Sequence, residues 1–95
     1  MQYSFDNQDF SIAMLGGGQL GKMLLAEAGR LDIKIDVLDP NPEAPAKKGA
    51  NFFKKGDFKD YDTVIKFASD ADAVVIEIES VNVEALEELE NRGIP

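Results

Sequence analysis

Short runs of apolar residues alternate with segments of helical periodicity along this chain of 95 residues. Within each run the apolar residues are consecutive, which is typical of strands that are buried on both faces of a sheet. Strands of this kind, each separated from the next by a helix, form a parallel sheet, because every connection has to cross back over the sheet. The pattern therefore predicts an α/β fold with helices on both faces.

The predicted strands and helices follow one another in regular order. Strands are expected at residues 11–15, 33–38, 51–54 and 73–78. Helices are expected from residue 20 to about 32, at 60–69 and at 83–91, with a short helix at 44–50 in a proline-rich loop. Right-handed crossovers favour the spatial order three, two, one, four, which is half of a doubly wound nucleotide-binding fold.

The first predicted helix has apolar residues at steps of three and four, which places them on one helical face. We expect this face to be buried against the sheet. Its members are Leu20, Met23, Leu24, Ala28 and Leu31.

The composition excludes several classes of function. The chain has no cysteine and no histidine, so it has no disulfide framework, no Cys/His zinc site, no thiol nucleophile and no imidazole base. Its net charge of -8 makes nucleic acid an unfavourable partner. The apolar runs are far shorter than the ~20 residues that cross a bilayer. We expect a soluble cytoplasmic protein with no membrane partner.

A glycine-rich turn is the first candidate site. Gly16, Gly18 and Gly21 follow the first strand and open the first helix, with the spacing G-x-G-x-x-G. Such a turn can hold an anion or a sugar against backbone groups, or it can simply be a tight connection between strand and helix. Gln19 lies at the mouth of the turn and can both donate and accept hydrogen bonds.

Acidic residues end two of the predicted strands. Asp39, eighteen residues beyond Gly21, is placed either to bind a ribose hydroxyl or to cap the loop that starts at Pro40. Glu77 and Glu79 follow the apolar run of the fourth strand and point to one side. The predicted strand order brings Glu77 beside the glycine turn, which favours a role in binding a ligand. The alternative is that both glutamates are simply solvated side chains at the end of a strand in an acidic chain.

Three stretches carry a resemblance to a known family. They read M-L-G-G-G-Q-L-G-K-M at 14–23, V-L-D-P-N-P-E-A-P-A at 37–46 and E-I-E-S-V at 77–81. Together they resemble the N-terminal domain of the 5-(carboxyamino)imidazole ribonucleotide synthetases, over about residues 11–95. Around the third stretch, residues 76–82 depart from the commoner Y-E-F-E-N-V-P of that family at Ile76, Ser80 and Asn82.

The resemblance implies an activity for a longer protein. The family belongs to the ATP-grasp enzymes of de novo purine synthesis, which use ATP with Mg²⁺ and bicarbonate to carboxylate aminoimidazole ribonucleotide. Residues 1–95 would then be a single, Rossmann-like pre-ATP-grasp domain, with 1–10 as an N-terminal extension. The ATP-grasp and C-terminal domains, which bind the ATP, would lie outside this chain, and the full-length enzyme is compatible with a homodimer.

The resemblance also implies roles for residues. The ribonucleotide would be contacted by Gly18, Gln19, Leu20 and Glu77, with a secondary set of Gly16, Gly17, Asp39 and Glu79. No catalytic group and no metal ligand is expected in this chain. The chain also lacks the P-loop motif G-x-x-x-x-G-K-[ST], so we expect it to be inactive toward ATP by itself.

Three alternatives remain at this point. The glycine turn and Asp39 alone would suit an NAD- or FAD-binding Rossmann domain, although a dinucleotide normally needs a second half. The related formate-dependent glycinamide ribonucleotide transformylases usually have Glu where Gln19 stands. A receiver-like or flavodoxin-like module would explain acidic residues at strand ends but not the glycines.

Overall fold

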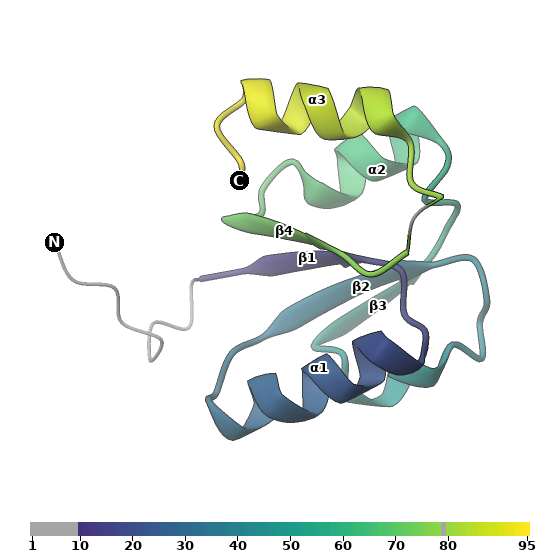
Figure 1. Cartoon of the computed structure of the whole chain (residues 1–95), viewed down its shortest axis with the longest axis vertical. Helices are drawn as coiled ribbons and strands as arrows, with labels where there is room; N and C mark the ends of the chain where they lie inside the picture. The colour runs from purple at the N-terminus through teal and green to yellow at the C-terminus, as the bar shows by residue number, and fades with distance from the viewer. Residues whose placement is uncertain (1–9, 79) are drawn as a thin grey trace, which may run out of the picture.

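The computed structural model describes residues 10–78 and 80–95, and it contains a four-stranded parallel sheet between two layers of helices (Figure 1). The strands are β1 (Ile12–Leu15), β2 (Ile35–Asp39), β3 (Phe52–Lys55) and β4 (Ala73–Ile76). The helices are α1 (Gln19–Arg30), α2 (Tyr61–Ala68) and α3 (Val83–Asn91), with a 3₁₀ helix η1 (Pro45–Gly49).

The order of the strands is β3-β2-β1-β4, which confirms the order predicted from the sequence. β1 pairs with β2 in the register Leu15 to Leu38, and with β4 in the register Leu15 to Ile76. The α/β class and the helices on both faces are confirmed as well. α1 covers one face of the sheet, and α2 and α3 cover the other (Figure 1).

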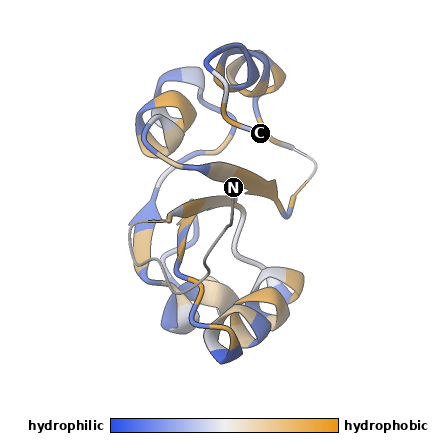
Figure 2. Cartoon of the chain, turned by 90° about the vertical axis from the view of Figure 1, so that its left-hand side faces the viewer, coloured by the Kyte–Doolittle hydropathy of each residue, from blue (hydrophilic) through white to orange (hydrophobic). Residues whose placement is uncertain are grey.

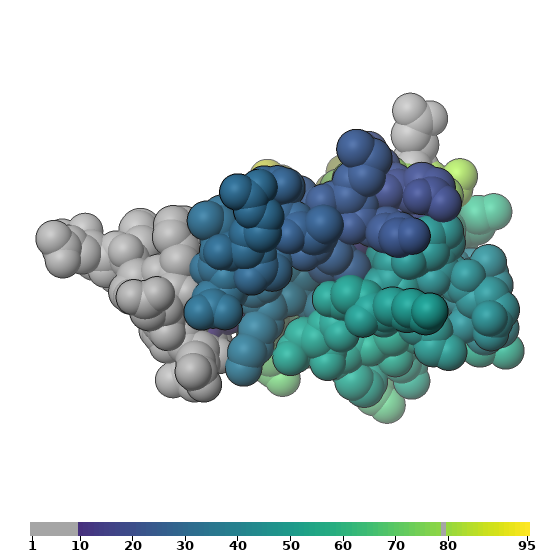
Figure 3. All heavy atoms as spheres, turned by 90° about the horizontal axis from the view of Figure 1, so that it is seen from below, coloured from purple at the N-terminus to yellow at the C-terminus, as the bar shows by residue number. Residues whose placement is uncertain are grey.

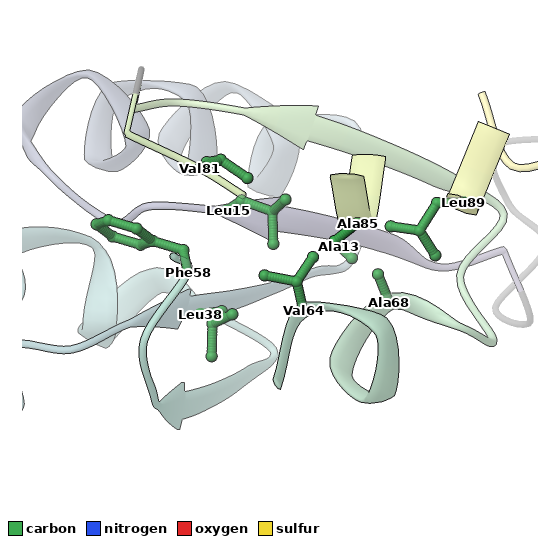
Figure 4. Close-up of a cluster of buried hydrophobic side chains, with 9 residues drawn as sticks. All are labelled: Ala13, Leu15, Leu38, Phe58, Val64, Ala68, Val81, Ala85 and Leu89. Carbon is green, nitrogen blue, oxygen red and sulfur yellow. The ribbon is translucent and has the colours of Figure 1, made fainter. Parts of the chain in front are cut away.

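The sheet is buried on both faces because alternate side chains of its central strand enter different cores. Ala13 and Leu15 enter a core formed with α2 and α3, whose members are shown in Figure 4. Met14 enters the other core, beneath α1 and η1. Figure 2 shows the apolar strands lying between the two helical layers. This two-sided burial explains why the strands read as continuous apolar runs.

The helix ends follow the expected local chemistry. Asp60 caps α2 by accepting hydrogen bonds from the Thr63 hydroxyl at 2.7 Å and the Thr63 amide at 3.0 Å, and these bonds lower the pKa of the Asp60 carboxyl below its ordinary value. Asn82 caps α3 by accepting from the Ala85 amide at 2.8 Å. Gly93, just after α3, has a φ of +87°. Gly93 therefore has the left-handed conformation that favours glycine just after the end of a helix.

The predicted burial of the first helix is wrong for four residues. Leu20, Met23, Leu24 and Leu31 are exposed, at 66%, 66%, 41% and 62% of their surface. The buried residues of α1 are instead Gly21, Leu25 and Ala28.

The side chains at these two sets of positions explain the difference. Gly21 and Ala28 are small, so the helix can approach the sheet closely along the stripe that they share with Leu25. A Cβ on Gly21 would lie 3.0 Å from Cε of Met14 on β1. The exposed leucines lie roughly a quarter turn around the helix from this stripe. Figure 3 shows the face on which α1 lies beside the segment containing η1.

No helix within residues 10–78 and 80–95 is long and apolar enough to span a bilayer. The proposed N-terminal extension, residues 1–10, falls almost entirely outside the described part of the chain.

Candidate functional site

The glycine turn connects the end of β1 to the start of α1. Gly16 continues the pairing of β1 with β2 by donating to the Leu38 carbonyl at 2.8 Å, and its φ of +102° then turns the chain sharply. Gly18 is the N-cap residue of α1 and has no side chain that could accept a hydrogen bond from the first amides of the helix.

Glu77 supplies that missing cap from another strand. Its amide donates to the Leu15 carbonyl at 2.9 Å, which places Glu77 directly beside the glycine turn, as the predicted strand order required. Its Oε2 accepts a hydrogen bond from the Gly21 amide at 3.2 Å. A carboxylate at this position also interacts favourably with the positive end of the helix dipole. Glu77 therefore stabilises the start of α1.

The spacing of the glycines makes room for this carboxylate. A Cβ on Gly16 would lie 2.7 Å from Oε1 of Glu77, and a Cβ on Gly18 would lie 2.8 Å from Oε2. Both distances are shorter than real Cβ contacts. The glycine pattern is thus matched to an acidic side chain of the same chain, which fills the space beside the turn.

Asp39 lies on the opposite side of the turn, at the end of β2. Its Oδ2 accepts from the Gly17 amide at 2.8 Å, and its Oδ1 accepts from the Asn41 amide at 2.9 Å. The second bond caps the loop after Pro40, so the loop-capping interpretation of Asp39 is confirmed. The bond to Gly17 is an additional contact that the sequence did not reveal.

The structure brings the main predicted contact residues together at the carboxyl edge of the sheet. Gly18, Gln19 and Leu20 form the first turn of α1 beside Glu77, and the side chains of Gln19 and Leu20 face solvent. Asp39 is separated from Glu77 by the glycine turn. Glu79 lies outside the described residues, so its predicted role stays a prediction.

Sequence reasoning missed the residues that pack on the glycine turn from the following loop. A Cβ on Gly17 would lie 3.3 Å from Cβ of Ala46 and 3.6 Å from Cβ of Ala44. Ala46 also donates its amide to the Gly17 carbonyl at 2.9 Å. The small side chains of the A-P-A stretch were visible in the sequence, but nothing in the sequence showed that they face the glycines.

Carboxylates of this chain make the surroundings of the glycine turn unfavourable for a phosphate. A phosphate site of the usual kind uses free amides at the start of the helix. Here the amides of Gly17 and Gly21 already donate to carboxylates, and a second anion beside Glu77 would be repelled. The site instead offers carboxylate and amide oxygens that can accept hydrogen bonds from hydroxyl or amine donors. Across residues 10–78 and 80–95 we find no acidic cluster that could hold a metal ion.

Comparison with known protein families identifies the domain. Residues 10–95 match the family model described as the ribonucleotide synthetase preATP-grasp domain. The chain belongs to this family. A preATP-grasp domain is what the three sequence stretches led us to expect, and the match covers all three.

Individual relatives are named after different enzymes of ribonucleotide chemistry. The chain is 39% identical over 83 residues to a chloroplastic phosphoribosylaminoimidazole carboxylase of Vigna aconitifolia, covering 87% of this chain and 15% of the relative. It is 40% identical over 85 residues to a formate-dependent phosphoribosylglycinamide formyltransferase of Prochlorococcus marinus, covering 87% of this chain and 22% of the relative.

A solved structure agrees with this preATP-grasp domain in fold. The carboxyaminoimidazole ribonucleotide synthase of Aspergillus clavatus, crystallised with ATP, superimposes with a TM-score of 0.77 and 40% identity. The match covers 86% of this chain and 22% of that protein. The preATP-grasp domain therefore spans about a quarter or less of the relatives that it matches.

Proposed function

We propose that this domain forms the ribonucleotide side of an ATP-dependent carboxylase of purine synthesis. The full-length protein would convert aminoimidazole ribonucleotide, ATP and bicarbonate to 5-(carboxyamino)imidazole ribonucleotide, ADP and phosphate. The supporting observation is the position of Glu77, whose carboxylate lies at the turn beside Gly18, Gln19 and Leu20 and faces the first turn of α1.

The proposed contacts follow from the chemistry of this edge. Glu77 uses one lone pair of Oε2 for the Gly21 amide, and a carboxylate has further acceptor positions for ribose hydroxyls. Gln19 and the backbone around Gly18 and Leu20 complete the contacts. The substrate phosphate would bind elsewhere, because it would be repelled by Glu77. Of the secondary set of Gly16, Gly17, Asp39 and Glu79, the first two are buried, and both carboxylate oxygens of Asp39 already accept hydrogen bonds from backbone amides.

ATP and Mg²⁺ belong to other domains in this proposal. The amides of Gly17 and Gly21 donate to carboxylates of this chain, and the charge of Glu77 would repel a nucleotide phosphate at the glycines. Residues 1–95 would act as one preATP-grasp domain whose partners are the ATP-grasp and C-terminal domains of the same protein. A cytoplasmic location and a homodimer of the full-length enzyme are parts of the same proposal.

The formate-dependent glycinamide ribonucleotide enzymes are the second candidate, favoured by the Prochlorococcus relative. Gln19 favours the imidazole substrate, because the related formate-dependent enzymes usually have Glu at the position of Gln19. The dinucleotide alternative loses support, because Asp39 accepts from the Gly17 amide and the Glu77 carboxylate lies where a pyrophosphate would have to approach the start of α1.

A variant of Glu77 tests the proposed contact. We would replace the matched segment of the Aspergillus clavatus enzyme by residues 10–95, numbered as here, and introduce Glu77→Gln. Gln retains an oxygen for the Gly21 amide, so the fold should survive. Losing a charge-assisted hydrogen bond to the ribose costs roughly 1.5 to 3 kcal/mol, which raises the KM for aminoimidazole ribonucleotide about tenfold or more. The KM for ATP should change little.

Glu90→Gln is the matched control, because Glu90 is an exposed carboxylate in the last turn of α3. It should leave both Michaelis constants unchanged. A folded Glu77→Gln chimera with an unchanged KM for the ribonucleotide would contradict the proposal and leave Glu77 as a helix cap only.

A further inference from the structure

Both backbone polar groups of Gly17 are bonded, one to the last residue of β2 and the other to the segment that follows it. The Gly17 amide donates to Oδ2 of Asp39 at 2.8 Å, and the Gly17 carbonyl accepts from the Ala46 amide at 2.9 Å. Gly17 itself is buried, so these two bonds replace the hydrogen bonds that water would otherwise make. The middle of the glycine turn is therefore held entirely by residues distant in the sequence.

The holding segment is itself a run of tight local turns. Oδ1 of Asp39 accepts from the Asn41 amide at 2.9 Å, and the Asn41 side chain accepts from the Glu43 amide at 2.9 Å. The Asn41 carbonyl then accepts from the Ala44 amide at 3.0 Å. We call residues 39–46 the 39–46 brace.

The brace also contacts the turn through small side chains. Ala44 and Ala46 are 4% and 0% exposed and lie against Gly17. A side chain at Gly17, or larger side chains at Ala44 and Ala46, would force the turn and the brace apart, because even a Cβ on Gly17 would lie 3.3 Å from Cβ of Ala46. The two sequence stretches, at 14–23 and 37–46, are thus the two halves of one packed unit.

We propose that Asp39 is a positioning residue, which orients the first turn of α1 for the ribonucleotide by holding Gly17, and that it does not contact the substrate. This inference rests on the proposed function. Gln19 follows Gly17 by two residues, so a shift of the turn moves Gln19 and Leu20 directly. A displacement of about 1 Å in a positioned binding group can cost up to a hundredfold in rate.

Asp39→Asn tests the role of this carboxylate. The two amides bind different oxygens of Asp39, and Asn has an NH₂ group in place of one of these oxygens, so one of the two amides would face a donor. The bond to Asn41 is local and forms readily, and we therefore expect the Gly17 amide to lose its partner. In the chimera, the KM for aminoimidazole ribonucleotide should rise about tenfold, with kcat and the KM for ATP nearly unchanged.

Asn41→Ala separates positioning from direct contact. It leaves Asp39 in place and removes the side-chain bond that holds the brace. If Asp39 acts through Gly17, Asn41→Ala should raise the KM for the ribonucleotide about threefold. If Asp39 binds ribose directly, Asn41→Ala should leave the KM unchanged, and that result would overturn the proposal.

Asp72→Asn is the matched control, because Asp72 also joins two distant segments through one backbone amide. Its Oδ2 accepts a hydrogen bond from the Ser11 amide at 2.7 Å. Ser11 directly precedes β1, so this bond lies at the opposite edge of the sheet from the glycine turn. This variant should leave the KM for the ribonucleotide unchanged. An equal increase in Asp72→Asn and Asp39→Asn would show a general loss of stability and would also overturn the proposal.

Amide hydrogen exchange in the 95-residue chain, without ligand, tests the brace independently of the substrate. Exchange at Gly17 should become at least about tenfold faster in Asp39→Asn and stay within about twofold in Asp72→Asn. Unchanged exchange at Gly17 in Asp39→Asn would overturn the proposal. A wild-type chimera that is folded but inactive would instead refute the proposed function. Faster exchange at Gly17 in Asp39→Asn would in that case still show that Asp39 holds the turn.

Discussion

At the scale of single residues, Gly16 and Gly29 lie in contrasting environments. Gly16 has a φ of +102°, and a Cβ there would lie 2.7 Å from Oε1 of Glu77. Gly29 is in the last turn of α1, and a Cβ there would meet no atom within 4 Å. The same substitution should therefore have opposite effects at the two positions.

We predict that Gly16→Ala lowers the free energy of unfolding by about 2 to 4 kcal/mol, through left-handed backbone strain and the clash with Glu77. Gly29→Ala should raise it by about 0.5 to 1 kcal/mol, because alanine favours the helix. Denaturant unfolding of the 95-residue chain measures both values. Equal and small effects at the two glycines would contradict the geometry of the turn.

The sequence predicted the turn between β1 and α1 but not the hydrogen bonds that hold it. The spacing of Gly16, Gly18 and Gly21 after an apolar run indicated a turn between a strand and a helix, and this is confirmed. The acceptor for the Gly21 amide lies 56 residues away, on Glu77, and local patterns carry no information on such a contact. The pairing of Gly17 with Asp39 was hidden for the same reason.

At the scale of elements, α1 shows where helical periodicity is ambiguous. Gly21, Leu25 and Ala28 recur at helical spacing, and so do Leu20, Leu24 and Leu31. The sequence therefore contained two apolar stripes, and the larger side chains suggested the wrong one. The helix lies on the stripe with glycine and alanine because small residues allow close packing on β1. Leu20, Met23 and Leu24 line a hollow on the outer side of the helix.

Leu25→Ala and Leu31→Ala test this orientation. Leu25 is 5% exposed and packs in the core beneath α1, whereas Leu31 is 62% exposed. We expect Leu25→Ala to lower the free energy of unfolding by about 2 to 4 kcal/mol, from lost burial and the cavity that remains. Leu31→Ala should stay within about 0.5 kcal/mol of the wild type. The reverse ranking in denaturant unfolding would mean that α1 is rotated from the orientation described.

At the scale of the whole molecule, the topology determines which residues meet at the site. The order β3-β2-β1-β4 places β2 and β4 on either side of β1. Asp39 and Glu77, at or just after the ends of those strands, therefore flank the glycine turn. Continuous apolar runs and the handedness of crossovers were sufficient to predict this arrangement. In the proposed function the ligand also contacts domains outside this chain, and the fold was therefore easier to predict than the substrate.

The central claim is that this domain can serve as the ribonucleotide side of the synthetase. The most direct measurement is ADP formation by the wild-type chimera with the Aspergillus clavatus enzyme, with and without aminoimidazole ribonucleotide. We predict ADP formation that depends on the ribonucleotide, and no ATP hydrolysis above a buffer blank by the 95-residue chain alone. A folded chimera that binds ATP but forms no ADP in response to the ribonucleotide would contradict the claim.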